Sequence, residues 1–165
     1  MQSLHPVFLS FPQRYPEGSD IRAALRRKTR PVVLSPLWNR ARGVEKVRAW
    51  MGYSEAEIFL YFEVTETSVK AECLHDGDPV WNDSCVEFFI QSFQDERIYY
   101  NFEWNALGTC LYACGSEKQG RETPDVAQYA NIRRFPEMEP MPFPETDRDH
   151  PWGLTVTVPF SLLGR

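Results

Sequence analysis

Four side chains in two neighbouring stretches of the sequence have the types and spacing of a ligand-binding surface. Trp81 precedes Glu87 by six residues, and Glu103 and Asn105 stand two residues apart further on. A Trp ring can stack on the C–H groups of a pyranose, and carboxylate and carboxamide groups form hydrogen bonds with hydroxyls. The chemistry that these residues predict is recognition of a sugar, although Asn105 could instead be a strand-end amide that satisfies the turn before Gly108.

Glu87 and Glu103 lie in two runs that alternate in polarity, as expected for paired strands. Residues 84–91 and 97–105 would form a hairpin over residues 92–96, with both carboxylates on its polar side. Two adjacent carboxylates repel each other unless a proton, a cation or an arginine joins them. The apolar residues of the two runs define the core-facing side: Val86, Phe88, Ile90, Tyr100, Phe102 and Trp104.

The two carboxylates at this hairpin require a counter-charge. Arg48, Arg133 and Arg134 are the candidates, and the sequence does not choose among them. Leaving both carboxylates ionised and without a partner on a partly buried face would cost on the order of 1 kcal/mol or more. Two carboxylates also serve glycosidases, but here they stand on adjacent strands, and no nucleophile elbow, His-x-x-x-His or phosphate loop accompanies them. We therefore expect no catalytic residues and no enzyme.

Other alternating runs must supply the sheets that position these residues. Residues 57–64 and 152–160 both alternate apolar and polar side chains, which predicts strands with one core-facing side. Regularly spaced short strands indicate an all-β fold, an antiparallel β-sandwich. The apolar rows of residues 58–64, 86–90 and 154–160 should share one core, with Glu87 pointing away from it. Further candidate strands are residues 44–51, 68–72, 109–113 and 130–135.

The segments outside these runs are expected to be less regular. Residues 1–30 should form an N-terminal arm with a short helix from Asp20 to Arg30, in which Asp20 is the N-cap. Residues 31–165 should form a single β-sandwich domain. Within it, residues 115–151 are polar and rich in proline, which predicts a long functional or covering loop.

Size and charge restrict the classes of function. At 165 residues, with 42% hydrophobic and 14% aromatic residues, the chain suits one domain with a substantial core. A formal charge of −5 argues against nucleic acid or an anionic membrane as the main partner. No apolar run approaches the roughly 20 residues of a membrane span. No signal peptide is expected in this chain, so its location is cytoplasmic by default unless an export signal has been removed.

The cysteines match no zinc-binding pattern. Cys110 and Cys114 stand alone as a spaced pair, and Cys85 lies inside a predicted strand. We expect these three residues and Cys73 to be free thiols, with a disulfide as the alternative.

Three segments, in order, resemble the family 9 carbohydrate-binding modules, whose β-sandwich belongs to the wider DOMON-like group. They are Val80–Ile90, Tyr99–Thr109 and Trp152–Leu163. The resemblance covers residues 38–163 and is closest to stand-alone bacterial members. In sugar-binding members, stacking Trp residues hold the terminal sugar while a carboxylate and an arginine bind its hydroxyls. By motif position, Trp81 matches a stacking Trp and Glu87 matches the carboxylate.

The sequence departs from this family at two places. Glu103 stands in the strand where sugar-binding members often have an arginine, and the chain stops at Arg165, where they continue with a further strand and a second aromatic residue. The resemblance therefore implies a mono- or oligosaccharide as the partner, and a site that is open on one side and binds mono- or disaccharides weakly, in the millimolar range. It also implies an open sheet edge that favours self-association. The alternative is a structural or interaction β-sandwich that has lost its sugar site.

An acidic turn precedes the proposed site. Residues 76–79 read Asp-Gly-Asp-Pro, and Asn82 and Asp83 follow closely. Members of the resembled family often hold a structural calcium ion, and these oxygen-bearing side chains are of the type that calcium prefers. The spacing departs from that of an EF-hand loop, and an ordinary Asx-rich turn explains it equally. We expect no metal or other cofactor, with structural calcium as the alternative.

Overall fold

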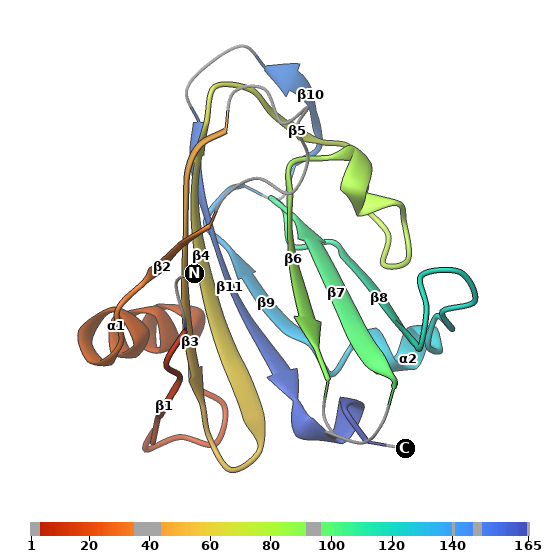
Figure 1. Ribbon diagram of the computed structural model, residues 1–165. Coiled ribbons are helices and arrows are strands. Elements are labelled where there is room, and N and C mark those ends of the chain that lie inside the picture. Colours follow the sequence, from red (N-terminus) through yellow and green to blue (C-terminus); the bar gives the residue numbers. More distant parts are fainter. Residues whose placement is uncertain (1–3, 35–43, 92–96, 140, 147–149, 165) are drawn as a thin grey trace.

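The computed structural model describes residues 4–34, 44–91, 97–139, 141–146 and 150–164, which form two layers facing each other across the main core (Figure 1). The larger layer consists of β1 (Val7–Phe8), β2 (Val32–Leu34), β3 (Val44–Tyr53), β4 (Glu57–Glu66), β9 (Arg133–Pro136) and β11 (His150–Pro159). Its strand order is β1-β3-β4-β11-β9, with β2 also paired to β3. All its ladders are antiparallel except the short β1–β3 pairing.

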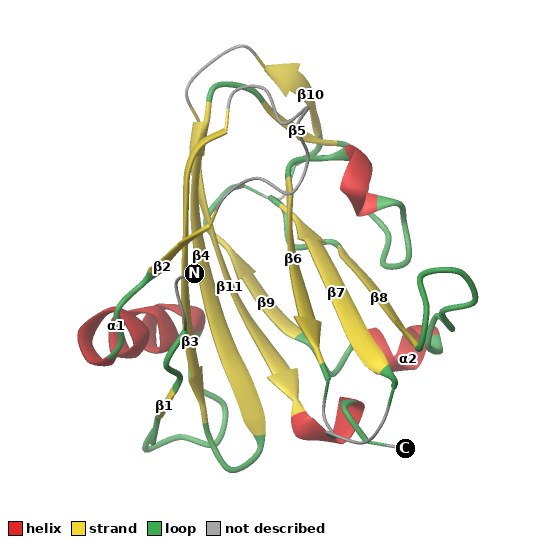
Figure 2. Ribbon diagram, viewed as in Figure 1, coloured by secondary structure: helices red, strands yellow, loops and turns green. Residues whose placement is uncertain are grey.

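The smaller layer is an antiparallel sheet of three strands. These are β6 (Cys85–Ile90), β7 (Tyr99–Asn105) and β8 (Cys110–Gly115), in that order. A separate ladder joins β5 (Val69–Ala71) to β10 (Phe143–Thr146). Short helices complete the described chain (Figure 2): α1 (Gly18–Lys28), α2 (Val126–Tyr129), η1 (Val80–Asn82) and η2 (Phe160–Leu162). The predicted antiparallel β-sandwich of the all-β class is confirmed, while the expected hairpin loop over residues 92–96 lies outside the described residues.

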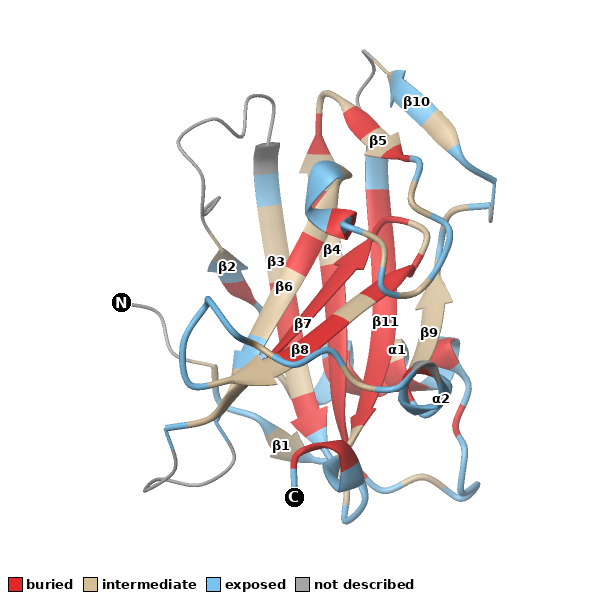
Figure 3. Cartoon of the chain, turned by 90° about the vertical axis from the view of Figure 1, so that its right-hand side faces the viewer, coloured by how far each residue is buried: buried red, intermediate tan, exposed pale blue. Residues whose placement is uncertain are grey.

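The three alternating runs share one core, as predicted. Apolar side chains of β4, β6 and β11 meet those of β7 and β8 in a single cluster, and Figure 3 shows the buried positions concentrated along β4, β7 and β11. At its centre, the Phe102 and Tyr112 rings stack with centroids 4.5 Å apart. Val86 is buried in this cluster, whereas Glu87 is on the opposite face and only half-buried. Phe160 is an exception because the chain turns into η2 after Pro159 and leaves that ring 39% exposed.

The N-terminal residues pack on the larger sheet. β1 and β2 both pair with β3, and α1 covers the outer face of the sheet with the buried side chains of Ile21 and Leu25. The helix begins at Gly18, earlier than expected, with Glu17 rather than Asp20 at its N-cap. Gly18 lies so close to Phe135 that an added Cβ would be 2.5 Å from the Phe135 side chain, so a residue without a side chain suits this first position of the helix. The boundary at residue 30 stays a prediction.

The proline-rich connection between β8 and β11 contains more regular structure than the sequence suggested. The expected strand at residues 130–135 is present as β9, shifted to Arg133–Pro136. α2 and β10 were not predicted. Pro144 lies inside β10, which is tolerated because β10 is an edge strand that pairs only with β5. This segment is therefore a series of short elements that cover the sandwich.

The cysteines form no disulfide bond among the described residues. All four cysteines are free. Burial raises the pKa of Cys73 to about 11 and that of Cys85 to about 12, so these thiols are protonated at neutral pH.

No helix in the described ranges is long and apolar enough to cross a membrane.

Candidate functional site

The outer face of the smaller sheet carries a hollow of about 870 Å³. The strands β6 and β7 form its floor, η1 lies at one end, and the connection after β8 forms a wall. Three of the four residues that the sequence suggested are brought together there, and one is not. The lining residues are Trp81, Glu87, Phe89, Tyr99, Asn101, Glu103, Lys118 and Arg121.

The register of the β6–β7 hairpin places the carboxylates side by side. Glu87 is the direct cross-strand partner of Glu103, which confirms that the two face each other. Asn101 lies two residues before Glu103 and therefore on the same face. Its Nδ2 donates a hydrogen bond of 2.6 Å to Oε1 of Glu103. The floor of the hollow is thus a row of oxygen acceptors from two carboxylates and one carboxamide.

Two of these acceptors are buried and lack a partner within the described part of the chain. Glu103 is 4% exposed and Asn101 is 2% exposed. Oε2 of Glu103 and Oδ1 of Asn101 accept no hydrogen bond from any described residue. A buried polar atom without a partner is costly, on the order of 1–3 kcal/mol. Because both residues line the hollow, hydroxyl donors from a bound molecule or from water could satisfy them.

Burial and mutual repulsion both disfavour the ionised carboxylates. Desolvation raises the pKa of Glu87, and the charges of Arg121 and Lys118 oppose this rise. Desolvation also raises the pKa of Glu103, and the charge of Glu87 adds to the rise, while the hydrogen bond from Asn101 and the charges of Arg121 and Lys118 oppose it. The nearby charges that act on this floor are therefore Lys118 and Arg121.

The prediction that Arg48, Arg133 or Arg134 is the counter-charge of Glu87 and Glu103 was wrong. Arg48 Nη1 lies 2.5 Å from an oxygen of Glu63, and Arg133 Nη2 lies 2.7 Å from an oxygen of Glu57. Arg134 pairs with Asp76 in the turn before η1. Each arginine already neutralises a carboxylate elsewhere in the fold. The paired residues are far apart in the sequence, so these ion pairs could not be recognised from it.

The actual counter-charges come from the loop after β8. The backbones of Cys114 and Glu122 exchange two hydrogen bonds, of 2.8 and 3.0 Å, and so close the loop at its base. Gly120 turns the chain with φ of 90°, a conformation that favours glycine. Lys118 and Arg121 are thereby held at the wall of the hollow. The sequence gave a partial signal, because this segment was expected to form a functional or covering loop.

Trp81 stands at the rim of the hollow, at the end where β6 begins. It is in η1, between Val80, which is fully buried, and Asn82, which is exposed. Val80 fixes η1 to the core, while the Trp81 side chain projects with 55% of its surface exposed. An exposed indole beside a row of acceptors is suited to stacking on a ring that those acceptors bind.

Asn105 does not reach the hollow, so its predicted role as a ligand is corrected. It is fully buried at the end of β7. Its Nδ2 donates to the Cys73 carbonyl at 2.9 Å and to Asp83 Oδ2 at 3.0 Å. Its Oδ1 accepts from the backbone N–H groups of Leu107 and Thr109. All its hydrogen-bonding capacity is used within the protein, and it fixes the turn after β7.

Asn101, Phe89 and Tyr99 were missed as site residues. They alternate with core residues on the two predicted strands, so the same period-2 pattern that placed Glu87 and Glu103 could have placed them. Their neutral character gave them no distinct chemical signal. Lys118 and Arg121 could be assigned to the site only from the path of the loop.

The acidic turn uses its oxygens as hydrogen-bond acceptors. Asp78 Oδ2 accepts from the backbone N–H groups of Leu74 and His75, and Asp76 Oδ1 accepts from that of Cys110. Burial of Asp83 by itself raises its pKa, but hydrogen bonds from Asn105 and the backbone outweigh this and lower it. Among the described residues, no three His, Cys, Asp or Glu side chains are grouped closely enough to hold a metal ion.

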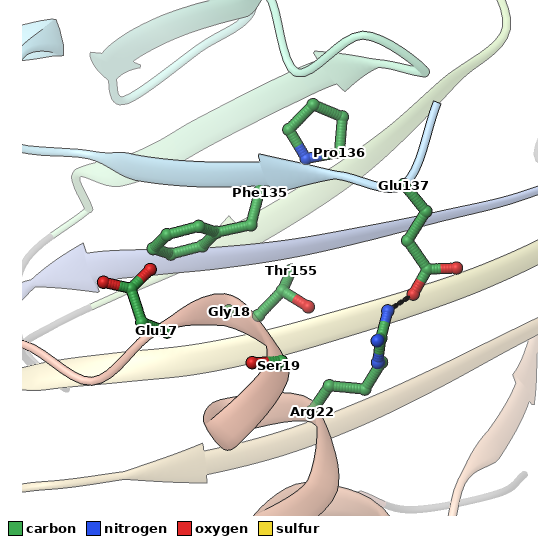
Figure 4. A pocket seen from close by; sticks show the side chains of 8 residues that line it. All are labelled: Glu17, Gly18, Ser19, Arg22, Phe135, Pro136, Glu137 and Thr155. Atoms are coloured by element: carbon green, nitrogen blue, oxygen red, sulfur yellow. Dashed lines mark ion pairs between the residues drawn. The ribbon is translucent and has the colours of Figure 1, made fainter. Parts of the chain in front are cut away.

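A second hollow lies on the other side of the molecule, where α1 begins (Figure 4). It has a volume of about 530 Å³ and lies between α1 and the β9 edge of the larger sheet. The figure shows Arg22 and Glu137 reaching toward each other at one side, where they form an ion pair. Its main charged groups of opposite sign are therefore already joined in an ion pair.

A family profile and a solved structure both match this chain. The profile of carbohydrate-binding family 9 matches residues 26–164. A crystal structure of a candidate carbohydrate-binding protein from Bacteroides uniformis ATCC 8492 superposes with a TM-score of 0.84 and 27% sequence identity. The match covers 96% of this chain and 72% of that one. A comparison with curated protein sequences gives no match.

Proposed function

The chain belongs to carbohydrate-binding family 9, and from this premise we propose that it binds a sugar or the end of a glycan, without catalysis, on the outer face of β6 and β7. The observation that carries the proposal is the pair of buried acceptors, Glu103 Oε2 and Asn101 Oδ1, which line a hollow and have no partner among the described residues. A ligand rich in hydroxyl donors would satisfy them.

Each group in the hollow has a distinct role in this proposal. The Trp81 ring stacks on the face of a sugar ring, and Glu87, Glu103 and Asn101 accept hydrogen bonds from its hydroxyls. Arg121, on the wall, donates to hydroxyl or ring oxygens. Glu103 thus contributes as an acceptor in the strand where an arginine was expected from the family resemblance. Asn105, predicted as a ligand, positions the end of β7 beside η1 instead.

Titration with a panel of soluble sugars tests the proposal. Binding should perturb the indole NMR signal of Trp81, and Trp81→Ala should weaken binding by roughly tenfold, because a stacked ring contributes about 1–2 kcal/mol. Glu103→Gln should also weaken binding, because a neutral amide is a poorer acceptor than a carboxylate. Leu74→Ala is the matched control, since Leu74 is 50% exposed and does not line the hollow. Unchanged affinity in Trp81→Ala would place the site elsewhere.

The absence of catalysis is part of the proposal. Incubation with oligosaccharides should release no shorter products, whereas hydrolysis abolished by Glu87→Gln would identify the carboxylate pair as a glycosidase dyad. A domain that holds a glycan without cleaving it would serve carbohydrate catabolism by keeping other proteins near their substrate.

The alternative is an interaction domain that retains only the fold. Within the described residues, no strand pairs with the outer edge of β6, and such an edge can accept a strand from a second copy or from a partner. Sedimentation at increasing concentration distinguishes the two functions. Self-association without any sugar binding would favour the interaction domain.

A further inference from the structure

A second aromatic group lies at the other end of the hollow from Trp81. Phe89 is 51% exposed, and its ring centroid is 6.0 Å from that of Tyr99, which is half-buried. Both residues line the hollow. An exposed Phe that rests on a neighbouring Tyr presents a supported apolar surface to whatever occupies the space above it.

Strand geometry fixes the distance between this group and the acceptors. Phe89 follows Glu87 by two residues on β6, so the two side chains are on the same face and about 7 Å apart along the strand. That step is comparable with the length of one sugar unit in a glycan chain. Trp81 lies at the opposite end, where η1 precedes β6. The acceptors thus lie between two aromatic ends.

Asn101 connects the two halves of this surface. It is the direct cross-strand partner of Phe89, while its Nδ2 donates to Glu103, the partner of Glu87. Its buried Oδ1 lacks a donor among the described residues. The acceptor row therefore continues from Glu103 to the level of Phe89, where a second ring could find both an apolar surface and a hydrogen-bond acceptor.

We propose that Phe89 and Tyr99 form a second sugar subsite, so that the preferred ligand is a glycan segment of at least two units aligned with β6. This inference rests on the proposed sugar binding. One unit occupies the subsite of Trp81, Glu87 and Glu103, and the next unit contacts Phe89 and Tyr99. The volume of about 870 Å³ lies within the range of pockets that enclose ligands larger than one sugar ring.

Calorimetric titration with sugars of increasing length tests the second subsite. The probes are glucose, xylose, mannose and N-acetylglucosamine, with their β-1,4-linked dimers and trimers. In the wild-type protein, the dimer of a sugar that binds should bind roughly fivefold or more tightly than the monomer, which is the gain expected from one aromatic contact. Phe89→Ala should remove this gain, so that the dimer loses more affinity than the monomer does. Trp81→Ala should weaken monomer and dimer alike.

Phe8→Ala is the matched control on the opposite sheet. Phe8 is 49% exposed and contacts Tyr53 with ring centroids 5.7 Å apart, so the substitution removes an equivalent ring with an equivalent neighbour. It should leave the affinity for every probe unchanged. Circular dichroism should show that Phe89→Ala folds, and Tyr99→Phe, which retains the ring, should keep the gain for the dimer.

The outcomes separate this inference from the function on which it rests. Binding of monomers with no gain for dimers, or equal weakening of both by Phe89→Ala, would overturn the second subsite and leave the proposed function intact. If no probe binds to the wild-type protein, the proposed function fails and the second subsite fails with it.

Discussion

The two sheets of the sandwich have similar residue types on their outer faces, but these residues pack under a helix on one sheet and line a hollow on the other. On the larger sheet, the cross-strand partners are Arg48 with Glu63, and Trp50 with Tyr61. On the smaller sheet, Glu87 is opposite Glu103. Both faces therefore combine aromatic rings with carboxylates, which is the combination that indicated a sugar site in the sequence.

The larger sheet neutralises and covers these groups. Arg26 of α1 pairs with Glu63 and lies over the rings of Trp50 and Tyr61, at 5.5 and 5.2 Å from their centroids. Apolar residues of the same helix bury that face. No described helix covers the smaller sheet in this way, and its carboxylates share only the charges of Lys118 and Arg121. On the larger sheet, the aromatic and acidic residues stabilise the packing of α1. On the smaller sheet, residues of the same types line a hollow that a ligand can enter.

The largest effect should come from uncovering the larger sheet. Leu25→Ala removes a fully buried side chain between α1 and β3, so the free energy of unfolding should fall by about 2–4 kcal/mol. Chemical denaturation measures this loss. Sugar affinity of the folded fraction should not change, because the hollow lies on the other sheet. A loss of affinity in folded Leu25→Ala protein would contradict the separation of the two faces.

An equivalent substitution on each face should change stability in opposite directions. Glu63→Gln removes the partner of two partly exposed arginines and should lower the free energy of unfolding by up to about 1 kcal/mol, with a smaller loss at high salt. Glu103→Gln removes one of two adjacent like charges and keeps an acceptor for Asn101. It should raise the free energy of unfolding by a few tenths to about 1 kcal/mol at neutral pH. If both substitutions lowered the free energy of unfolding equally, Glu103 would stabilise the fold as Glu63 does.

The smallest effect is a pH dependence of the free energy of unfolding that arises from Glu103 on the smaller sheet. Its pKa in the folded protein is raised from an ordinary value of 4.5, so its proton is bound more tightly in the folded state than in the unfolded state. This contribution to stability is fully present below pH 4.5 and is lost as the pH rises through the folded pKa. The stability difference between Glu103→Gln and wild-type should therefore be small in acid and grow over that window.

The measurement for this prediction is denaturation of both proteins at several pH values, with Glu139→Gln as a surface control. Glu87, Lys118, Arg121 and Asn101 face the same carboxylate and remain unchanged in each comparison. A difference that stays constant with pH would show that Glu103 titrates alike in the folded and unfolded states.

The sequence by itself determined the long strands of both sheets, the pairing of Glu87 with Glu103 and the resemblance to the family. Alternation with period 2 assigns each side chain of a strand to a face, and a one-residue slip would expose the whole apolar row of β6 and β7. The register, and with it the acidic floor of the site, therefore follows from local pattern. The same pattern contained Asn101 and Phe89, although their chemistry did not mark them as site residues.

Only the tertiary structure shows which charged groups, hydrogen bonds and helix lie against the outer face of each sheet. The counter-charges Lys118 and Arg121, the capture of Asn105 by Cys73 and Asp83, and the covering of the larger sheet by α1 all join segments far apart in the chain. Ion pairs and buried hydrogen bonds depend on separations of a few ångströms and on local burial. Such distances are set by how the sheets, loops and helix pack together, and no periodicity within a single segment encodes them.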